Sequence, residues 1–401
     1  MIKHASIVPL IGGNTLASQN IFGHRPDYLL SYSPFKANDS HLVNYYDNEM
    51  PYILLDEGGK YPHKVDVVTT CCPCAGLSSL SPAASSESVV NEWMYRSAEY
   101  VLENVKPQVF WGENAPRLAL RLGEPVVKRL RAIGAKNGYT FSIFKTRSIL
   151  HGLSQIRDRT FYFFWKGTQI PIMDYIRIEN HEKIEDTILH AHDGCAKDDP
   201  MCKLLTNQAR PSDYPFYKYL LNECYGGMSH AEFAKQLKVS VCALNAIESA
   251  GKKYNEVAKW MRKNGFDREA KKADRMYHKL NAGGNIMRKH VEIPAKHIGA
   301  FVGHFPTMLT HPIEDRFLTV REALSIMKLP KDFQLVNPSS SLNHMCQNVP
   351  VTTAEHPARM VKKFLEGGLD RIETPFLIQD NKNQSIDTQY ISSVSLDSFT
   401  S

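Results

Sequence analysis

The chain has 401 residues, a formal net charge of +6, and apolar and charged fractions of 43% and 22%. These proportions are ordinary for a globular protein, and no apolar run approaches the roughly 18 residues of a membrane-spanning helix, so a membrane protein and a wholly disordered chain are excluded. The length predicts one large domain with a smaller one. The opening MIKHASIVPLIGG reads as a strand and not a signal peptide, and the eight cysteines form no secreted disulfide framework, so we expect reduced thiols in the cytoplasm.

Short apolar runs alternate with amphipathic stretches over the first 165 residues. Strands are predicted at Ser6–Leu10, Tyr28–Tyr32, Val65–Thr70, Val109–Trp111, Tyr139–Phe144 and Thr160–Trp165. Helices are predicted between them at Asn91–Glu103 and Pro116–Ile133. The alternation predicts an α/β fold with a doubly wound, mostly parallel sheet.

The positive charge is concentrated in one later segment. Residues 251–300 contain nine Lys and four Arg against three Glu and two Asp, a net +8, so the rest of the chain carries −2. Such a block favours a polyanion partner, with nucleic acid ahead of a membrane surface, while a solvated helical face is the alternative. Tyr254–Leu280 predicts two basic helices broken at Asn264–Gly265, and His230–Gly251 fits either a helix-turn-helix or a plain helical pair.

Three further features belong to the C-terminal third. Alternating runs recur near Val291–Phe305. The segment RFLTVREALSIMKLP predicts a helix with Thr319 as N-cap, Glu322 completing a capping box, and an end at Pro330. From residue 381 the chain is polar and rich in Ser, Asn, Gln and Thr, so we expect a disordered tail over 381–401.

Reactive side chains follow the ends of two predicted strands. The run VDVVTTCCPC places Cys74 in the loop after a strand, stiffened by Pro73, and KPQVFWGENAP delivers Glu113 and Asn114 after another. In an open parallel sheet, ligands bind beyond the carboxyl ends of the strands. We therefore expect these groups to share one crevice.

A third element adds positive charge to the same crevice. HGLSQIRDRTFYFFW places Gln155, Arg157 and Arg159 just before a strand, and the two arginines project to the same side of an extended segment. A guanidinium lowers the pKa of a nearby thiol, and a carboxylic acid can protonate a ring nitrogen while the thiolate adds to the ring. The set predicts covalent catalysis on an electron-poor heteroaromatic ring.

The motifs in this order resemble those of the DNA (cytosine-5) methyltransferases, of the kind that bacteriophages or mobile elements carry. The resemblance spans residues 1–365. It rests on five segments: Pro73-Cys74, Gly112–Pro116, Gln155–Arg159, Arg316–Phe333 and Cys346–Pro350. It implies an S-adenosylmethionine-dependent methyltransferase fold with a catalytic domain over 1–168 and 336–380, and a smaller target-recognition domain over 169–335 that holds a basic helical block at 228–300.

The resemblance also implies a mechanism and partners. A cytosine flipped out of double-stranded DNA would be attacked at carbon-6 by Cys74, with Glu113 assisting at ring nitrogen 3, and S-adenosyl-L-methionine would supply the methyl group to carbon-5. Arg159 would contact the base, and Arg157 would brace the nucleophile loop or a phosphate. Gln155 would position the loop, and Asn114 would order the Glu113 segment. We expect a monomer without membrane contact in a bacterial host cell, in a restriction–modification or bacteriophage setting.

The cofactor end departs from the family pattern. Gly12 and Gly13 stand where a longer glycine-rich loop is usual, and Ser31-Tyr32 stands where the family has an acid for the ribose hydroxyls. Asp56 is the candidate for the adenine contact. The candidates from the last motif are Gln347 and Asn348.

Two alternatives to a DNA methyltransferase remain open: an RNA cytosine-5 methyltransferase, and a non-catalytic DNA-binding protein with a degenerate cofactor site. Candidate phosphate contacts are Lys252, Lys253, Lys271 and Lys272. The residues His190, His192, Cys195 and Cys202 are of the types that bind zinc, but their spacing is irregular, so we expect a polar loop and no metal.

Overall fold

The computed structural model describes residues 1–78, 81, 84–195, 198–203, 210–288, 290–303 and 306–388. The chain divides into two compact units, one of residues 1–181 and 327–401 and one of residues 182–326. The first unit is thus discontinuous in sequence, with the second inserted into it. No described helix has the length and apolarity to cross a membrane.

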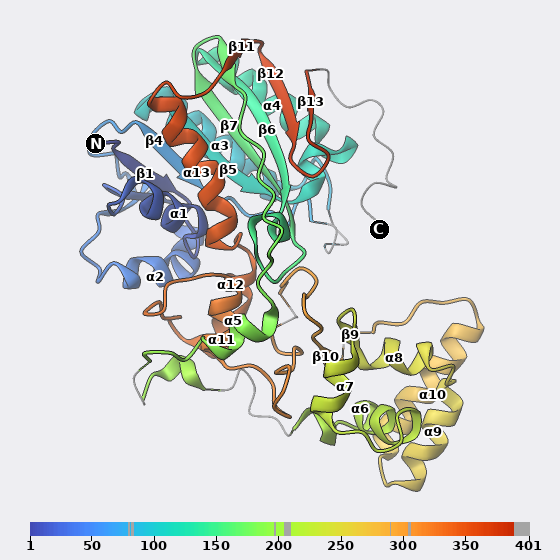
Figure 1. Ribbon diagram of the computed structural model, residues 1–401. Coiled ribbons are helices and arrows are strands. Elements are labelled where there is room, and N and C mark those ends of the chain that lie inside the picture. The colour runs from blue at the N-terminus through green and yellow to red at the C-terminus, as the bar shows by residue number, and fades with distance from the viewer. Residues whose placement is uncertain are drawn as a thin grey trace. The chain divides into compact units, whose positions relative to one another are not determined.

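The first unit is built on a nine-stranded sheet in the order β13-β12-β6-β7-β5-β4-β1-β2-β3 (Figure 1). Its strands are β1 (His4–Ile7), β2 (Leu29–Ser31), β3 (Tyr52–Leu54), β4 (Val67–Thr70), β5 (Val109–Asn114), β6 (Tyr139–Arg147), β7 (Asp158–Lys166), β12 (Phe376–Asp380) and β13 (Ser385–Asp387). Only β7 and β13 run antiparallel to their neighbours. The predicted doubly wound, mostly parallel sheet is confirmed.

Helices cover both faces of this sheet. The helices of this unit are α1 (Gly13–Phe22), α2 (Lys36–Tyr45), α3 (Glu92–Tyr100), α4 (Glu124–Lys136), α12 (Pro338–Cys346) and α13 (Val351–Leu365). On one face α1 packs against α13, and on the other α3 packs against α4 (Figure 1). The sheet is buried on both faces because its strands are almost wholly apolar, as in the run Phe161–Trp165, which is fully buried.

A small second sheet explains why the first unit extends to residue 181 and not to 168. The strand β8 (Gln169–Pro171) pairs antiparallel with β11 (Arg371–Glu373), which ties the segment after β7 to the C-terminal part of the chain. At the other boundary, the Val351 N–H donates to the Met327 carbonyl, so the first unit resumes at 327 and not at 336.

The expectation of a disordered tail is wrong for its first residues. Asn381 is buried and donates to Thr146 Oγ1 at 3.0 Å, and β13 pairs with β12. Polar composition misled here because a sheet edge accepts polar residues on its solvent side. The rest of the predicted tail, 389–401, lies outside the described residues.

The second unit is mostly helical. Its elements are α5 (Ile184–Leu189), α6 (Pro215–Tyr219), α7 (His230–Gln236), β9 (Val241–Cys242), α8 (Ala243–Ser249), α9 (Tyr254–Lys263), α10 (Asp267–Asn281), β10 (Glu292–Ile293) and α11 (Val320–Ile326). The two basic helices are confirmed, broken where Gly265 adopts a φ of +79°. The core of this unit includes Phe216, Leu244 and Met261.

Two local predictions for this unit can be compared with the structure. The capping box before α11 is confirmed, since the Thr319 N–H donates to Glu322 at 2.8 Å and the Glu322 N–H donates to Thr319 Oγ1 at 3.2 Å. The helix ends at Ile326, before Pro330. Between α7 and α8 lies the strand β9, paired with β10, so this stretch is a helical pair with an intervening strand and not a simple helix-turn-helix.

Candidate active site

Three neighbouring strands of the first unit bring the predicted reactive groups to one edge of the sheet. Strand β4 pairs parallel with β5, so the chain leaves both at the same edge, Thr70 lying opposite Gly112. Strand β7 runs antiparallel to β5 and therefore begins at that edge, with Asn114 opposite Thr160. Glu113 directly follows Gly112, Arg159 directly precedes Thr160, and Cys74 lies in the loop after Thr70.

Glu113 is a buried carboxylate with one ionic partner. Its side chain is 1% exposed, and Arg159 Nε lies 3.1 Å from its Oε2. Neither carboxylate oxygen accepts a hydrogen bond from any described residue. Burial raises the pKa of Glu113, while the Arg159 and Arg157 guanidiniums oppose the rise. The side chain therefore has the capacity to bind a further donor or to carry a proton.

Cys74 is half-buried in the loop that leaves β4, directly after the half-buried Pro73. Its carbonyl accepts a hydrogen bond of 3.0 Å from the Leu77 N–H, which closes a turn. Burial raises the pKa of the Cys74 thiol, the Arg159 and Arg157 guanidiniums lower it, and Glu113 raises it further. The structure thus places the thiol in the electrostatic field of the carboxylate and of both arginines.

Arg157 points into the protein interior. Its Nη2 donates to the carbonyls of Cys346 and Asn348, both at 2.7 Å, and its side chain is 0% exposed. The phosphate contact considered for Arg157 is therefore wrong, because a buried guanidinium that binds two carbonyls cannot reach a phosphate. Its hydrogen bonds instead fasten the chain after α12 to the start of β7.

Asn114 and Gln155 are also buried. Asn114 Oδ1 accepts a hydrogen bond of 2.8 Å from the Ala115 N–H, and its Nδ2 donates to Met94 Sδ at 3.1 Å. Gln155 Nε2 lies 3.9 Å from Met327 Sδ. Both amides therefore order backbone and side chains around the strand ends.

At the start of α1, the structure brings two of the candidate cofactor residues together. Gly12 has a φ of +95°, which favours glycine, and the Gly13 N–H donates to Asn348 Oδ1 at 3.1 Å. A Cβ on Gly13 would lie 2.6 Å from the Val349 carbonyl oxygen, so only glycine permits this approach. The Nδ2 of Asn348 is buried and has no hydrogen-bond partner among the described residues.

Comparison with protein families identifies the chain. The family model of the C-5 cytosine-specific DNA methylases matches residues 36–363. The chain belongs to this family. Methyltransferases of this kind use S-adenosylmethionine. A comparison with curated protein sequences finds no match.

Solved structures resemble this chain in fold. A protein described as a DNA modification methyltransferase encoded within a prophage (E. coli) has a TM-score of 0.54 and 13% identity, over 91% of this chain and 100% of its own. The Entamoeba histolytica methyltransferase EhMeth has a TM-score of 0.53 and 11% identity, over 91% of this chain and 99% of its own. At these identities the likeness establishes the fold alone.

Two of the five candidate cofactor residues, Asp56 and Gln347, are exposed and bound elsewhere. Both carboxylate oxygens of Asp56 accept from the Ser33 N–H, at 2.9 and 3.1 Å. Gln347 Oε1 accepts from Asn38 Nδ2 at 2.8 Å. These contacts place Asp56 next to the end of β2, and they separate Gln347 from the Gly13–Asn348 contact.

Sequence reasoning missed Asp39, a buried carboxylate in α2. Its Oδ1 accepts from the Leu10 N–H at 2.9 Å, and its Oδ2 accepts from Ser31 Oγ at 2.5 Å and from Tyr52 OH at 2.8 Å. Burial raises the pKa of Asp39 to about 7, although these hydrogen bonds oppose the rise. The one available signal was its place three residues before the buried Leu42 on the same helical face. Asp39 joins the loop after β1, the last residue of β2 and the first residue of β3.

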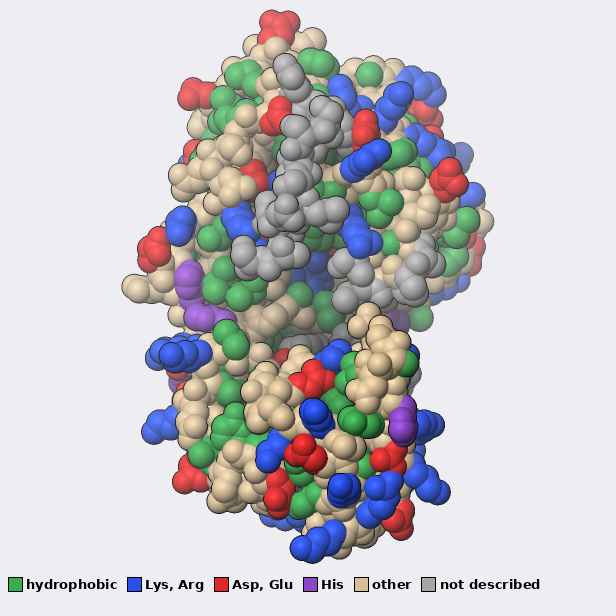
Figure 2. Space-filling view, turned by 90° about the vertical axis from the view of Figure 1, so that its right-hand side faces the viewer, with side chains coloured by type: hydrophobic (Ala, Val, Ile, Leu, Met, Phe, Trp, Pro, Cys, Tyr) green, Lys and Arg blue, Asp and Glu red, His purple; other side chains and the backbone are tan. Residues whose placement is uncertain are grey.

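The basic block of the second unit is largely exposed. Lys253 directly precedes α9 and Lys271 lies in α10, both exposed, whereas Lys272 Nζ lies 5.5 Å from the centre of the Phe216 ring. Lys252 is half-buried. On the face drawn in Figure 2, Lys and Arg side chains of this unit stand among Asp and Glu side chains. The surface is therefore mixed in charge on that face.

Proposed function

We propose that this chain is a DNA (cytosine-5) methyltransferase in which Cys74 is the nucleophile and Glu113 is the acid. The observation that carries the proposal is Glu113 itself. Its buried carboxylate accepts no hydrogen bond in the described part of the chain, and it lies beside a guanidinium and near a half-buried thiol. Burial of such a carboxylate costs folding free energy unless a ligand supplies the missing hydrogen bond. Ring nitrogen 3 of a cytosine would do so.

In the proposed reaction, the Cys74 thiolate acts first, as the nucleophile. Cys74 sulfur would form a bond to carbon-6 of the ring, and the electrons of the carbon-5–carbon-6 double bond would shift toward nitrogen 3. Since burial keeps the pKa of Cys74 high, the Arg159 and Arg157 guanidiniums are what favour the thiolate. The attack therefore depends on the positive charge of both arginines, of which Arg159 is paired with Glu113 and Arg157 acts from the protein interior.

Glu113 would take up the charge that this attack develops. A carboxyl group with a raised pKa holds a proton more readily at neutral pH, and it can deliver that proton to nitrogen 3 as the thiolate adds. Carbon-5 then becomes electron-rich. S-adenosylmethionine, when bound, would supply a methyl group to carbon-5. Loss of the carbon-5 proton to solvent, cleavage of the sulfur–carbon-6 bond and return of the nitrogen 3 proton to Glu113 would restore the aromatic ring and the Cys74 thiolate.

The remaining residues would position these two. Arg159 would hold the Glu113 carboxylate through their 3.1 Å ion pair and would lie next to the bound base. Arg157 is a positioning residue, because its side chain reaches the carbonyls of Cys346 and Asn348 and not the crevice. Pro73, Asn114 and Gln155 would fix the loops on which the reacting groups stand.

The residues present fit S-adenosylmethionine at the start of α1. The unpartnered Nδ2 of Asn348, buried beside Gly13, offers a donor to a carboxylate such as that of the cofactor. Trp93 lies 5.1 Å from Tyr32 and 4.9 Å from Phe35, measured between ring centres, next to the end of β2, and offers an apolar surface for adenine. Asp56 would reach the cofactor only by releasing the Ser33 N–H.

Methyl transfer to duplex DNA and to tRNA tests the proposal directly. With tritiated S-adenosylmethionine, label should enter duplex DNA and should disappear in Cys74→Ser, while Cys224→Ser, which changes a half-buried thiol of the other unit, should retain it. Label in tRNA alone would instead make the chain an RNA methyltransferase. DNA binding without label in either substrate would refute both enzymatic functions.

A covalent trap tests the role of Cys74 separately. DNA with 5-fluorocytosine at the cognate site should yield an adduct that survives denaturation, because fluorine at carbon-5 blocks the last elimination step. The adduct should form with Cys224→Ala and not with Cys74→Ala. An equal yield of adduct from Cys74→Ala would contradict the assignment of the nucleophile.

A further inference from the structure

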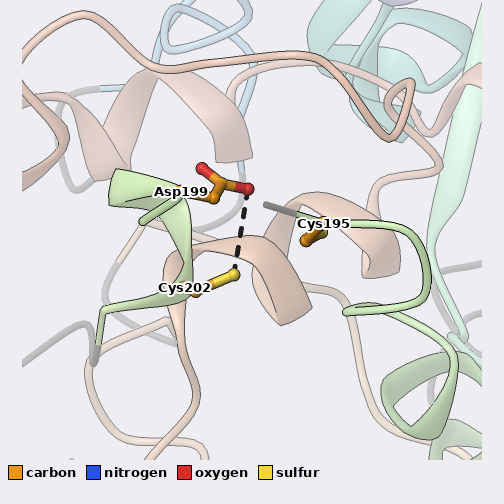
Figure 3. Close-up of side chains that lie close together, drawn as sticks. All are labelled: Cys195, Asp199 and Cys202. Carbon is orange, nitrogen blue, oxygen red and sulfur yellow. Dashed lines mark hydrogen bonds between the residues drawn. The ribbon is translucent and has the colours of Figure 1, made fainter. Parts of the chain in front are cut away.

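The second unit gathers metal-binding side chains in the segment before α11. The ligand atoms of Cys195, Asp199 and Cys202 all lie within 4.8 Å of one another. Figure 3 shows the three side chains, with Cys202 Sγ joined to Asp199 Oδ2 at 3.8 Å. All three are half-buried. Two thiols and a carboxylate at this spacing match the distances between ligands around one small cation.

His192 lies at the edge of this cluster. Its Nδ1 is 3.2 Å from Cys202 Sγ, and its Nε2 is 3.3 Å from Glu322 Oε1. Glu322 accepts two hydrogen bonds from Arg316, at 2.9 and 2.7 Å, so it is an ionised carboxylate that only accepts. His192 Nε2 therefore carries the proton, and the Nδ1 lone pair faces the cluster. A carboxylate that orients the far nitrogen is the usual support of a metal-binding histidine.

Asp199 is held in place by the residues around it. Arg321, which is 2% exposed, donates to its Oδ2 at 2.8 and 3.2 Å, and the Met201 N–H donates to its Oδ1 at 2.8 Å. The arginine comes from α11, as does Glu322. The segment from His192 to Cys202 is thus fastened to α11 at two points, which fixes the donors without any metal.

We propose that His192, Cys195, Asp199 and Cys202 bind one zinc ion. Two sulfurs, one imidazole nitrogen and one carboxylate oxygen favour Zn²⁺ over Mg²⁺ or Ca²⁺, which prefer oxygen ligands. Four protein donors close a tetrahedral site, so the ion has a structural role and fixes the segment 192–202 against α11. On binding, the two thiols lose their protons to solvent and the ion takes their place. The site is independent of methyl transfer.

Metal content of the full-length protein tests the site. After gel filtration in metal-free buffer, elemental analysis should find about one zinc ion per chain. Cys202→Ala should retain little zinc, whereas Cys224→Ala should retain all of it. Wild-type protein without bound zinc, or a Cys224→Ala variant that loses zinc to the same extent as Cys202→Ala, would overturn the proposal.

Binding of Co²⁺ to the wild-type protein provides a second test that does not depend on whether Cys202→Ala folds. Wild-type protein stripped with a chelator and loaded with Co²⁺ should show the sulfur-to-cobalt absorption of thiolate ligation, and it should melt at a higher temperature than the stripped form. His192→Gln should weaken Co²⁺ binding, with an expected loss of about tenfold or more. A Cys195–Cys202 disulfide in the purified protein, or a Co²⁺ spectrum without thiolate absorption, would refute the site.

Discussion

Charged side chains are buried at the strand ends of the first unit, whereas they are exposed on the helices α9 and α10 of the second unit. At the strand ends, Glu113 and Arg157 are fully buried and each has defined neighbours. On the helices, Lys271 is exposed and the buried face is apolar, formed by residues such as Val257 and Met261. A buried charge depends on its partners, whereas an exposed one is solvated with or without them.

This difference in burial predicts which substitutions have large effects on stability and activity. Removal of a buried partner leaves a charge or a hydrogen-bonding group unsatisfied, at a cost of several kcal/mol in unfavourable cases. Neutralisation of an exposed lysine changes long-range attraction, which salt screens. We therefore expect effects to fall steadily from the strand ends of the first unit to the basic helices of the second.

The largest effect is expected at Glu113. Glu113→Gln should lower methyl transfer by about 100- to 10,000-fold, because the amide cannot deliver a proton to the ring. The same change should speed alkylation of Cys74 by iodoacetamide, since loss of the carboxylate charge lowers the pKa of the thiol. Slower alkylation together with slower methyl transfer would indicate a distorted site. The experiment would then not separate proton delivery by Glu113 from its effect on the pKa of Cys74.

A large effect on stability is expected at Asp39. Asp39→Ala removes the acceptor for the Leu10 N–H and for the Ser31 and Tyr52 hydroxyls, and should lower the free energy of unfolding by about 3 kcal/mol in urea titrations. Asn38→Ala, which alters an exposed neighbour in the same helix, serves as the control. Equal losses from both would mean that the buried hydrogen bonds of Asp39 add nothing to stability.

The pH dependence of stability provides a second measurement at Asp39. Burial raises the pKa of folded Asp39 to about 7, whereas an unfolded aspartate has a pKa of about 3.9. The folded state therefore holds the proton more tightly, and the contribution of Asp39 to stability falls as pH rises from about 4 to about 7, by at most about 1.4 kcal/mol per pH unit. Asp39→Asn should abolish this fall. A slope unchanged in the variant would assign it to other groups.

A smaller effect is expected from the charge of Arg159. Arg159→Met should raise the pKa of Cys74, because a guanidinium that lowers it is lost, and should slow alkylation of the thiol at neutral pH by about tenfold. The pH profile of alkylation should shift to more alkaline values, and Arg159→Lys should restore much of the rate. An identical profile in the Met variant would exclude Arg159 from activation of the thiol.

The smallest effect is expected on the exposed helices. Lys271→Gln should reduce the slope of log binding constant against log salt concentration by about 0.9 if Lys271 contacts one phosphate. Lys272→Gln should affect stability as well, since its ammonium lies over Phe216. Lys166→Gln, an exposed lysine of the first unit, provides the control. A slope equal to that of the wild type would assign Lys271 to the solvated surface.

The sheet could be predicted from the sequence because its strands are marked by short apolar runs, and six of the strands lie where such runs occur. The short β3 was missed, as was β12, which pairs with β6 from more than 200 residues away. The contacts of Arg157 could not be predicted either, because its partners are the backbone carbonyls of residues 346 and 348. Backbone acceptors leave no mark in a sequence, so no motif could have indicated this contact.

The reactive side chains were easier to predict than their surroundings. Glu113 lies at the end of β5 and Cys74 in the loop after β4, and the parallel pairing of β4 with β5 brings these strand ends together. Asp39 joins three strands from a helix, and its partners lie 29, 8 and 13 residues away without periodicity. His192, Cys195 and Cys202 of the proposed zinc site were recognisable by type, although their irregular spacing predicted a polar loop. Asp199 was missed, and only the folded segment shows that Cys195, Asp199 and Cys202 converge.

The insertion of the second unit into the first has a consequence for synthesis on the ribosome. Strand β6 cannot pair with β12, and α1 cannot pack against α13, until nearly the whole chain has been made. A nascent or truncated chain that ends before residue 351 lacks both α13 and β12, and it therefore exposes an unpaired edge of β6 and the apolar residues that α13 normally covers. Such edges promote association between chains. Premature termination late in this gene should thus yield aggregated protein, and not a smaller active enzyme.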